Sequence, residues 1–270
     1  MTRVVVVGAG VGGLGAAARL AGAGCDVTVL EASAEIGGKL GIERWQDHVF
    51  DTGPSLLTMP FTIEETLAAA RVELADALDL LPVEPICRYR WHDGAELATW
   101  TDLARTMGEM DRLDPGAGAA WRDLLEQGRR TWDLSLPLFL SQPFGSIVDL
   151  ARRSGRPIDP RDILAHVTLA QLGARRFTDP RLRQVVDRYA TYAGADPARA
   201  PGTLSVIPYT ETAFGAWHPR GGMHRIAEAL RDAIELRGGE VRVQAPVARI
   251  VVEGGAAVGV ELADGERIAA

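Results

Sequence analysis

Hydrophobic residues follow three different patterns along the chain, and together these patterns predict an α/β protein. The first pattern is a continuous apolar run, found at Val4–Val7 and again at Val27–Leu30. Such runs are typical of parallel strands that are buried on both faces. An alanine-rich stretch from Gly12 to about Ala23 lies between them and predicts a helix. The start of the chain is therefore a predicted strand, helix and strand.

The second pattern is helical spacing, which dominates the middle of the chain. Thr62–Glu65 has the composition of a capping box and predicts a helix that runs to about Arg71. Aspartate caps free N–H groups and proline suits the first helical position, so each Asp-Pro pair predicts a helix start. These pairs are Asp114-Pro115, Asp159-Pro160 and Asp179-Pro180.

The third pattern consists of short strand-like segments separated by turn residues. Cys87–Trp91 and Glu96–Trp100 flank His92-Asp93-Gly94 and predict a β-hairpin. Further on, Met223–Arg237 predicts an amphipathic helix that Gly238-Gly239 would stop. The remaining predicted strands are Val241–Val243, Val247–Val252 and Ala257–Leu262, followed by a turn at Ala263–Gly265.

The glycines after the first predicted strand point to a dinucleotide. Gly8 permits a tight turn, Gly10 lets the backbone approach a pyrophosphate, and Gly13 lets the helix pack closely on the strand. The N-terminus of the helix, at Gly12, favours a bound phosphate. Glu31 follows the second strand, where a carboxylate can bind ribose hydroxyls and would repel a 2′-phosphate. The agreement of strand, helix and Glu31 favours a dinucleotide over a glycine-rich turn with no ligand.

Three further motifs narrow the choice of dinucleotide. They are Gly37-Gly38-Lys39, Phe50–Ser55 (FDTGPS) and Pro219–Met223 (PRGGM). With the glycine turn, they resemble FAD-dependent flavoproteins of the phytoene desaturase branch, which are similar to flavin amine oxidases. The resemblance is clear over about the first eighty residues and moderate over the last fifty.

The resemblance implies roles for individual residues. Gly38 and Lys39 would lie along the FAD, Gly53, Pro54 and Ser55 would lie near the flavin, and Val247 would pass its backbone beside the adenine. Taken locally, Asp51–Ser55 is equally compatible with an Asp-initiated turn that binds nothing.

The resemblance also implies a domain organisation. A Rossmann-like FAD-binding domain would be discontinuous, made of residues 1–80 and 218–270, with a mainly helical substrate domain inserted at 81–217. Members of the family continue beyond the point that corresponds to Arg267–Ala270. We therefore expect a fragment, a truncated product or half of an assembly completed by a second polypeptide, with weak FAD binding and uncertain activity alone.

Composition excludes several functions. The net charge of −7 argues against nucleic acid as a partner. Two cysteines, Cys25 and Cys87, cannot form a disulfide framework, and reduced thiols in a cytoplasmic protein are the simplest interpretation. The sequence shows no secretory signal and no stretch long enough to span a bilayer.

Other candidate chemistry is weak. The spacing of the five histidines does not suit a metal site, so no metal is expected. Ser55 and Ser205 lack the nucleophile-elbow pattern of hydrolases. His218 and His224 bracket the PRGGM motif, and a structural role before a helix is favoured over contact with substrate or flavin.

Two features bear on membranes. Leu134–Leu140 with Pro143-Phe144 is the most apolar local segment, and it is either buried core or a contact with the membrane interface. Arg152, Arg153 and Arg156, with Arg175-Arg176, would attract anionic lipid, although a solvated helix face is the commoner explanation. Peripheral attachment to the inner face of a membrane is thus one alternative.

The resemblance implies an FAD-dependent oxidoreductase that dehydrogenates a long, lipid-soluble polyene. The alternatives are another flavin oxidoreductase, such as an amine oxidase, or a non-catalytic remnant. No residue stands out as a catalytic base.

Overall fold

The computed structural model describes residues 1–141, 143, 146–154 and 164–270. It divides into two compact units. Unit 1 consists of residues 1–82 and 217–270, and unit 2 consists of residues 83–216. The segment that forms unit 2 is therefore inserted between the two parts of unit 1.

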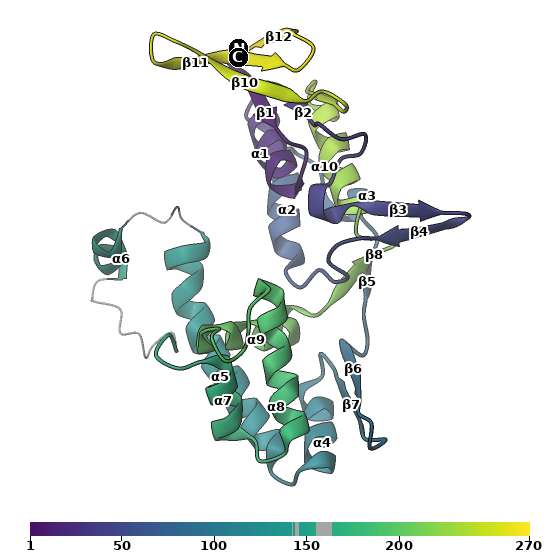
Figure 1. The fold of residues 1–270 in the computed structure, drawn as a ribbon, viewed down its shortest axis with the longest axis vertical. Coiled ribbons are helices and arrows are strands. Elements are labelled where there is room, and N and C mark those ends of the chain that lie inside the picture. Colours follow the sequence, from purple (N-terminus) through teal and green to yellow (C-terminus); the bar gives the residue numbers. More distant parts are fainter. Residues whose placement is uncertain (142, 144–145, 155–163) are drawn as a thin grey trace. The chain divides into compact units, whose positions relative to one another are not determined.

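A three-stranded parallel sheet organises unit 1 (Figure 1). Its strands are β1 (Arg3–Val7), β2 (Asp26–Leu30) and β9 (Glu240–Arg242), in the order β1-β2-β9. Helix α1 (Val11–Gly22) connects β1 to β2 and buries Leu14, Ala17, Ala18 and Ala21. The predicted strand, helix and strand at the start of the chain are confirmed.

One prediction about β1 is wrong. Its valines were expected to be buried on both faces, but Val4–Val6 are only partly buried and Val7 is 53% exposed. The reason is the position of the strand, because β1 lies at one edge of the sheet. An apolar run indicates that the side chains favour burial. It does not indicate whether the strand has a neighbouring strand on both sides.

Helices α1, α2 (Pro60–Ala69) and α10 (Arg225–Leu236) form the main core of unit 1 with this sheet. The packing of α1 on α2 is close enough to require Gly22, since a Cβ atom there would stand 1.9 Å from the carbonyl oxygen of Ala69. The predicted helix at 223–237 is confirmed within two residues, and Gly238-Gly239 follows it. A short helix, α3 (Leu74–Ala77), and a 3₁₀ turn, η1 (Gly38–Leu40), complete the helical part.

The predicted capping box at Thr62–Glu65 is wrong. Helix α2 starts two residues earlier, with Met59 as its cap and Pro60 at its first turn. The Thr62 hydroxyl donates to the carbonyl oxygen of Met59 at 2.8 Å and so does not accept a helix N–H in the way a capping box requires. Proline fixes the helical φ angle in advance, and this local constraint decides the start.

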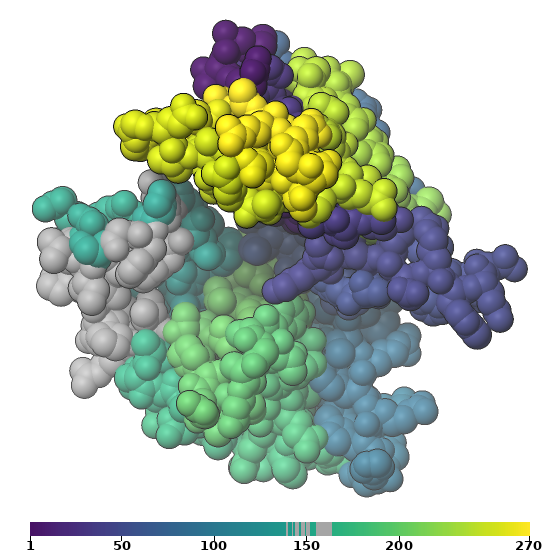
Figure 2. All heavy atoms as spheres, turned by 45° about the horizontal axis from the view of Figure 1, so that its top comes forward, coloured from purple at the N-terminus to yellow at the C-terminus, as the bar shows by residue number. Residues whose placement is uncertain are grey.

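Smaller sheets complete unit 1. Strands β3 (Ile42–Trp45) and β4 (His48–Asp51) form a hairpin, and β5 (Leu80–Pro82) pairs with β8 (Trp217–Pro219). The antiparallel sheet β10-β11-β12 lies on the surface of the unit, where it is yellow in Figure 2. Its strands are β10 (Val247–Glu253), β11 (Ala256–Leu262) and β12 (Arg267–Ala269). The predicted strands β9, β10 and β11 are confirmed, and β12 was not predicted.

Unit 2 is mainly helical and contains the predicted hairpin, which is confirmed as β6 (Cys87–Arg90) and β7 (Glu96–Thr99). Trp121, Leu124 and Tyr189 are among the largest fully buried side chains of its core. Its helices are α4 (Leu103–Leu113), α5 (Ala117–Ser135), α6 (Ile147–Ser154), α7 (Leu169–Arg176), α8 (Pro180–Asp187) and α9 (Val206–Phe214). Shorter turns are the π-helical η2 (Leu136–Leu140) and the 3₁₀ segments η3 (Arg188–Ala193) and η4 (Gly202–Ser205).

The three Asp-Pro pairs have different outcomes. Asp179 caps α8 as predicted, because its carboxylate accepts the N–H of Arg181 at 2.7 Å. Asp114 instead ends α4, and the cap of α5 is Gly116, whose φ of +93° is easily adopted only by glycine. The third pair, Asp159-Pro160, lies outside the described residues.

Candidate functional site

The turn between β1 and α1 depends on two glycines. Gly8 has a φ of +98° and donates its N–H to the carbonyl oxygen of Leu30 at 2.7 Å, which ties the turn to the end of β2. A Cβ atom on Gly13 would stand 2.0 Å from the carbonyl oxygen of Gly8. Both glycines are therefore required by the protein itself, for the turn and for close packing of helix on strand.

Gly10 and Gly12 stand in a different environment. Apart from the chain neighbours and the nearby backbone of α1, no heavy atom of the described residues lies within 4 Å of a Cβ built on either of them. Gly10 is the cap of α1, and no described side chain hydrogen-bonds to the first turn of this helix. Unpaired N–H groups and the positive end of the helix dipole thus face open space, an arrangement that suits an anion such as phosphate.

Glu31 lies directly behind this turn. Its Oε2 accepts the N–H of Ala9 at 2.8 Å, and its Oε1 accepts the N–H of Ser33 at 2.9 Å and the Ser33 hydroxyl. Burial raises the pKa of this carboxyl, but the hydrogen bonds from Ser33, Ala9 and Ala32 outweigh burial and lower the pKa overall. Glu31 is therefore charged at neutral pH and is directed toward the glycine turn.

The Gly37–Lys39 motif lies against the same turn. Gly37 donates its N–H to the carbonyl oxygen of Ala9 at 2.8 Å, and a Cβ on Gly38 would stand 3.2 Å from the Cα of Gly10. Gly53 is packed on the other side, where a Cβ would stand 1.7 Å from the carbonyl oxygen of Lys39. Three sequence motifs thus meet through backbone contacts that leave no room for side chains.

These motifs surround a cavity of about 490 Å³, a size typical of ligand sites. Four of the residues predicted to bind FAD line it, namely Gly10, Gly12, Lys39 and Pro54. Gly8, Gly13, Glu31, Gly38 and Gly53 form the framework behind these four.

Two other predicted residues lie elsewhere. The Ser55 carbonyl oxygen is 3.1 Å from Nδ1 of His218. Val247 pairs with Leu262 in the β10-β11 sheet and packs in a small apolar cluster with Leu30 and Ala245. Neither is among the residues that line the cavity.

Sequence reasoning missed the apolar part of the lining. It comes from Val11, Leu40, Leu56, Leu57, Ile63, Met223 and Ile226. Leu56 and Leu57 directly follow the FDTGPS motif, and Met223 ends the PRGGM motif, so the motifs could have pointed to these three. Ile63 and Ile226 lie on buried helix faces, where nothing in the sequence separates a lining residue from an ordinary core residue.

Both histidines around the PRGGM motif make backbone contacts. His224 is 6% exposed, and its Nδ1 lies 2.6 Å from the carbonyl oxygen of Leu40. His218 contacts Ser55 as above, and its Nε2 lies 4.0 Å from Oδ2 of Asp51. Within the described ranges, no group of three or more His, Cys, Asp and Glu side chains is placed to hold a metal ion.

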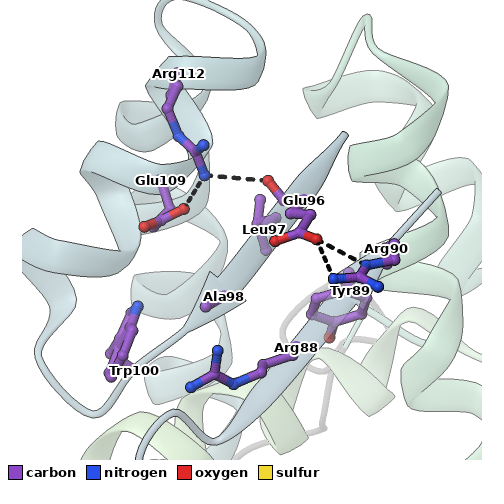
Figure 3. A pocket seen from close by; sticks show the side chains of 9 residues that line it. All are labelled: Arg88, Tyr89, Arg90, Glu96, Leu97, Ala98, Trp100, Glu109 and Arg112. Atoms are coloured by element: carbon purple, nitrogen blue, oxygen red, sulfur yellow. Dashed lines mark hydrogen bonds and ion pairs between the residues drawn. The ribbon is translucent and has the colours of Figure 1, made fainter. Parts of the chain in front are cut away.

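A second cavity, of about 340 Å³, belongs to unit 2 (Figure 3). Four of its charged side chains are paired with one another: Arg90 lies 2.5 Å from Glu96, and Arg112 pairs with Glu109. Both arginines are more than half exposed. This cavity is a charged surface groove, unlike the apolar cavity of unit 1.

The most buried acidic group of unit 2 is Glu211, which is 2% exposed. Its carboxylate oxygens each lie 3.2 Å from Nη2 of Arg188 and accept hydrogen bonds from the hydroxyls of Tyr189 and Tyr192. The Arg188 guanidinium also lies 4.4 Å from the centre of the Tyr189 ring. Two opposite charges are thus compensated inside the helical core.

The structure describes only part of the apolar segment and of the arginine cluster that suggested membrane contact. Leu138 is buried, as in the core alternative, whereas Leu140 is 60% exposed. Arg152 pairs with Asp149 at 3.4 Å. Phe144 and Arg156 lie outside the described residues. No helix in the described part of the chain combines the length and apolar character needed to cross a membrane.

The parallel sheet and the open helix N-terminus at the cavity make unit 1 an α/β unit whose geometry suits a nucleotide. The family model for flavin containing amine oxidoreductases matches residues 11–270, and the chain belongs to this family. A flavin is therefore the cofactor of its class, which supports the prediction of FAD.

Among curated relatives, the chain is 40% identical to the hydroxyneurosporene desaturase of Cereibacter sphaeroides and 34% identical to the zeta-carotene-forming phytoene desaturase of Myxococcus xanthus. Each alignment covers 99% of this chain but only 54% and 52% of these relatives, respectively. The resemblance to carotenoid desaturases is confirmed. The chain spans about half the length of the curated relatives it matches.

Solved structures share the fold. An oxidoreductase from Methanosarcina mazei aligns with a TM-score of 0.63 at 20% identity, over 100% of this chain and 57% of its own. Cyclohexylamine oxidase from Brevibacterium oxydans aligns with a TM-score of 0.56 at 19% identity, over 98% of this chain and 55% of its own. The chain thus has the mixed helix and sheet architecture of amine oxidase-type oxidoreductases.

Proposed function

We propose that the chain carries the FAD-binding site of a carotenoid desaturase, which removes hydrogen from a saturated carbon–carbon pair of a long polyene. One observation carries the proposal: the N-terminus of α1 is open toward the cavity at Gly10 and Gly12. The described surroundings leave room for a side chain at both positions, yet both residues are glycine. The named activities of the relatives support a polyene more than an amine as the substrate.

The residues present fit an FAD. The N–H groups of the first turn of α1 would hold the diphosphate, and Glu31 would accept hydrogen bonds from a ribose while it keeps its contact with Ala9. Lys39 would add a positive charge beside the diphosphate. The apolar lining at Leu56, Leu57 and Met223 would exclude water from the uncharged part of the ligand. When bound, the flavin supplies the hydride acceptor.

We further propose the roles of the two units. Residues 1–80 and 218–270 would form the Rossmann-like FAD-binding domain, with Ser55 near the flavin and Val247 beside the adenine. Residues 81–217 would form the inserted substrate domain. The edge of β1 that no described strand covers, where Val7 is half exposed, would pair with a further strand, which either a second polypeptide or more of the same chain would supply.

The proposed activity is tested with the protein, FAD and phytoene in liposomes. New absorption at longer wavelength would report a longer conjugated polyene. A Gly12→Ala variant serves as the matched control, because its Cβ would stand in the space in front of α1 with no contact to the described residues outside its own helix. Wild-type protein that is loaded with flavin but forms no polyene, and that instead releases hydrogen peroxide with amines, would favour an amine oxidase. Protein that binds no flavin would point to a non-catalytic remnant.

A further inference from the structure

A single carboxylate connects the FDTGPS motif to the PRGGM motif. Asp51 ends β4, and its Oδ2 accepts the N–H of Met223 at 2.9 Å while its Oδ1 accepts the N–H of His224 at 3.3 Å. These two amides directly precede α10, and the side chain of His224 does not cap that helix. Asp51 therefore caps α10 from a distant part of the sequence, with a negative charge at the positive end of the helix dipole.

The contact continues to Leu40, another residue that lines the cavity. His224 Nδ1 lies 2.6 Å from the carbonyl oxygen of Leu40, next to the Gly37–Lys39 motif. Glycines keep this region tight: a Cβ on Gly222 would stand 3.1 Å from Asp51 Oδ1, and a Cβ on Gly37 would stand 3.0 Å from His224 Nδ1. Asp51, His224 and Leu40 thus form one chain of hydrogen bonds across three segments.

Asp51 does not itself line the cavity, but its contacts do. Met223 and Leu40 both line the cavity. The N–H of Met223 is held by Asp51, and the carbonyl oxygen of Leu40 is held by His224. A shift of Met223 would move the apolar part of the lining, whereas the turn before α1 is also held by Leu30 and Glu31, neither of which contacts Asp51.

We propose that Asp51 is a positioning residue that sets the position of Met223 relative to Leu40 in the apolar lining of the cavity and thereby the affinity for the flavin part of FAD. This inference rests on the proposed function for the identity of the ligand. It assigns to Asp51 no contact with the ligand.

The test compares FAD with ADP, which carries the diphosphate but no flavin. In an Asp51→Asn variant, the amide group would face one of the two N–H groups as a donor, so one charge-assisted hydrogen bond is lost. The dissociation constant of FAD, measured by fluorescence quenching, should rise about tenfold at a temperature well below unfolding. The dissociation constant of ADP should not change. A merely structural role would lower the unfolding temperature and leave the FAD to ADP ratio as it is.

Asp79→Asn is the matched control. Asp79 Oδ2 accepts from Arg220 Nε at 2.6 Å, so it holds the same PRGGM segment, but both side chains are more than half exposed. This variant should bind FAD as the wild type does. A loss of FAD affinity as large as that of Asp51→Asn, or equal losses for FAD and ADP in Asp51→Asn, would overturn the inference.

Hydrogen–deuterium exchange tests the link without any ligand. Asp51→Asn should speed exchange at residues 223–226 and, through His224, at residues 38–41, while residues 15–20, in the body of α1, stay protected. Unchanged exchange at 38–41 would overturn the inference even if FAD binds. A wild type that binds neither FAD nor ADP would instead overturn the proposed function. The exchange data would still decide whether Asp51 links the segments around Met223 and Leu40.

Discussion

The Cα atom of Gly53 faces the carbonyl oxygen of Lys39 so closely that a Cβ atom at residue 53 would stand 1.7 Å from it. Because backbone meets backbone here, the clash cannot be relieved by rotating a side chain. We predict that Gly53→Ala lowers the free energy of unfolding by about 3 kcal/mol, at the upper end of typical overpacking costs. Denaturant titration measures this effect. A loss below about 0.5 kcal/mol would contradict the close contact.

Replacement of Gly12 by alanine should not lower the free energy of unfolding, in contrast to Gly53→Ala. Gly12 lies in α1 with open space around its Cβ position, so Gly12→Ala should leave folding intact or stabilise it by about 0.5–1 kcal/mol. The added methyl group would stand where the diphosphate approaches, so the dissociation constant of FAD should rise about tenfold or more. Fluorescence titration and thermal unfolding measure the two quantities.

Gly15→Ala provides the control for this prediction. It lies in the same helix, and its Cβ would stand 3.7 Å from Cγ2 of Thr66, an ordinary contact. FAD affinity should remain unchanged in this variant. Equal weakening by Gly12→Ala and Gly15→Ala would mean that the first turn of α1 is not the binding site.

The charge of Glu31 should make stability depend on pH. Its pKa is lowered in the folded protein, so its contribution to stability is present above the unfolded value near 4.5 and is lost as pH falls through the folded value. Compared with Glu31→Gln, the wild type should be more stable by about 1 kcal/mol at neutral pH, and this difference should shrink below pH 4.5.

Denaturant titrations of both proteins at several pH values measure the difference. Glu35→Gln is the control, because Glu35 lies in the same loop with an exposed side chain. It should give no comparable dependence on pH. A difference between wild type and Glu31→Gln that stays constant down to pH 3 would show that the Glu31 charge does not hold the turn.

The buried pair in unit 2 should behave as a coupled unit. Arg188→Met leaves the Glu211 carboxylate buried with only tyrosine hydroxyls as partners, so it should cost about 3–5 kcal/mol of stability. Adding Glu211→Leu removes the uncompensated charge, so the double variant should be more stable than Arg188→Met alone. Denaturant unfolding of the wild type, the two single variants and the double variant measures the coupling. Changes in the free energy of unfolding that simply add would exclude it.

Local patterns predicted local structure well. The unit from β1 to β2, the β6-β7 hairpin and the cap at Asp179 each depend on residues close in sequence, and each is confirmed. The errors arose where two local signals competed. Pro60 determined the start of α2 against Thr62, and Gly116 determined the start of α5 against Asp114.

The site could be predicted only in part, for a physical reason. Gly10, Gly12, Lys39 and Pro54 belong to recognisable motifs and do line the cavity. The hydrogen bonds from Met223 and His224 to Asp51 join residues more than 170 positions apart, and no spacing rule reports such a pair. The apolar lining is likewise invisible, because Ile63 and Ile226 resemble every other buried residue of their helices.

Helices α1 and α10 both begin near the cavity, and a carboxylate from another segment lies behind each start. Asp51 accepts the N–H of His224, the cap of α10, and of Met223 before it, whereas Glu31 reaches only Ala9, the residue before the cap of α1. The lining consequently combines the backbone of the first turn of α1 with apolar side chains such as Leu56 and Met223. A ligand that joins a charged bridge to a flat uncharged ring would complement both kinds of lining.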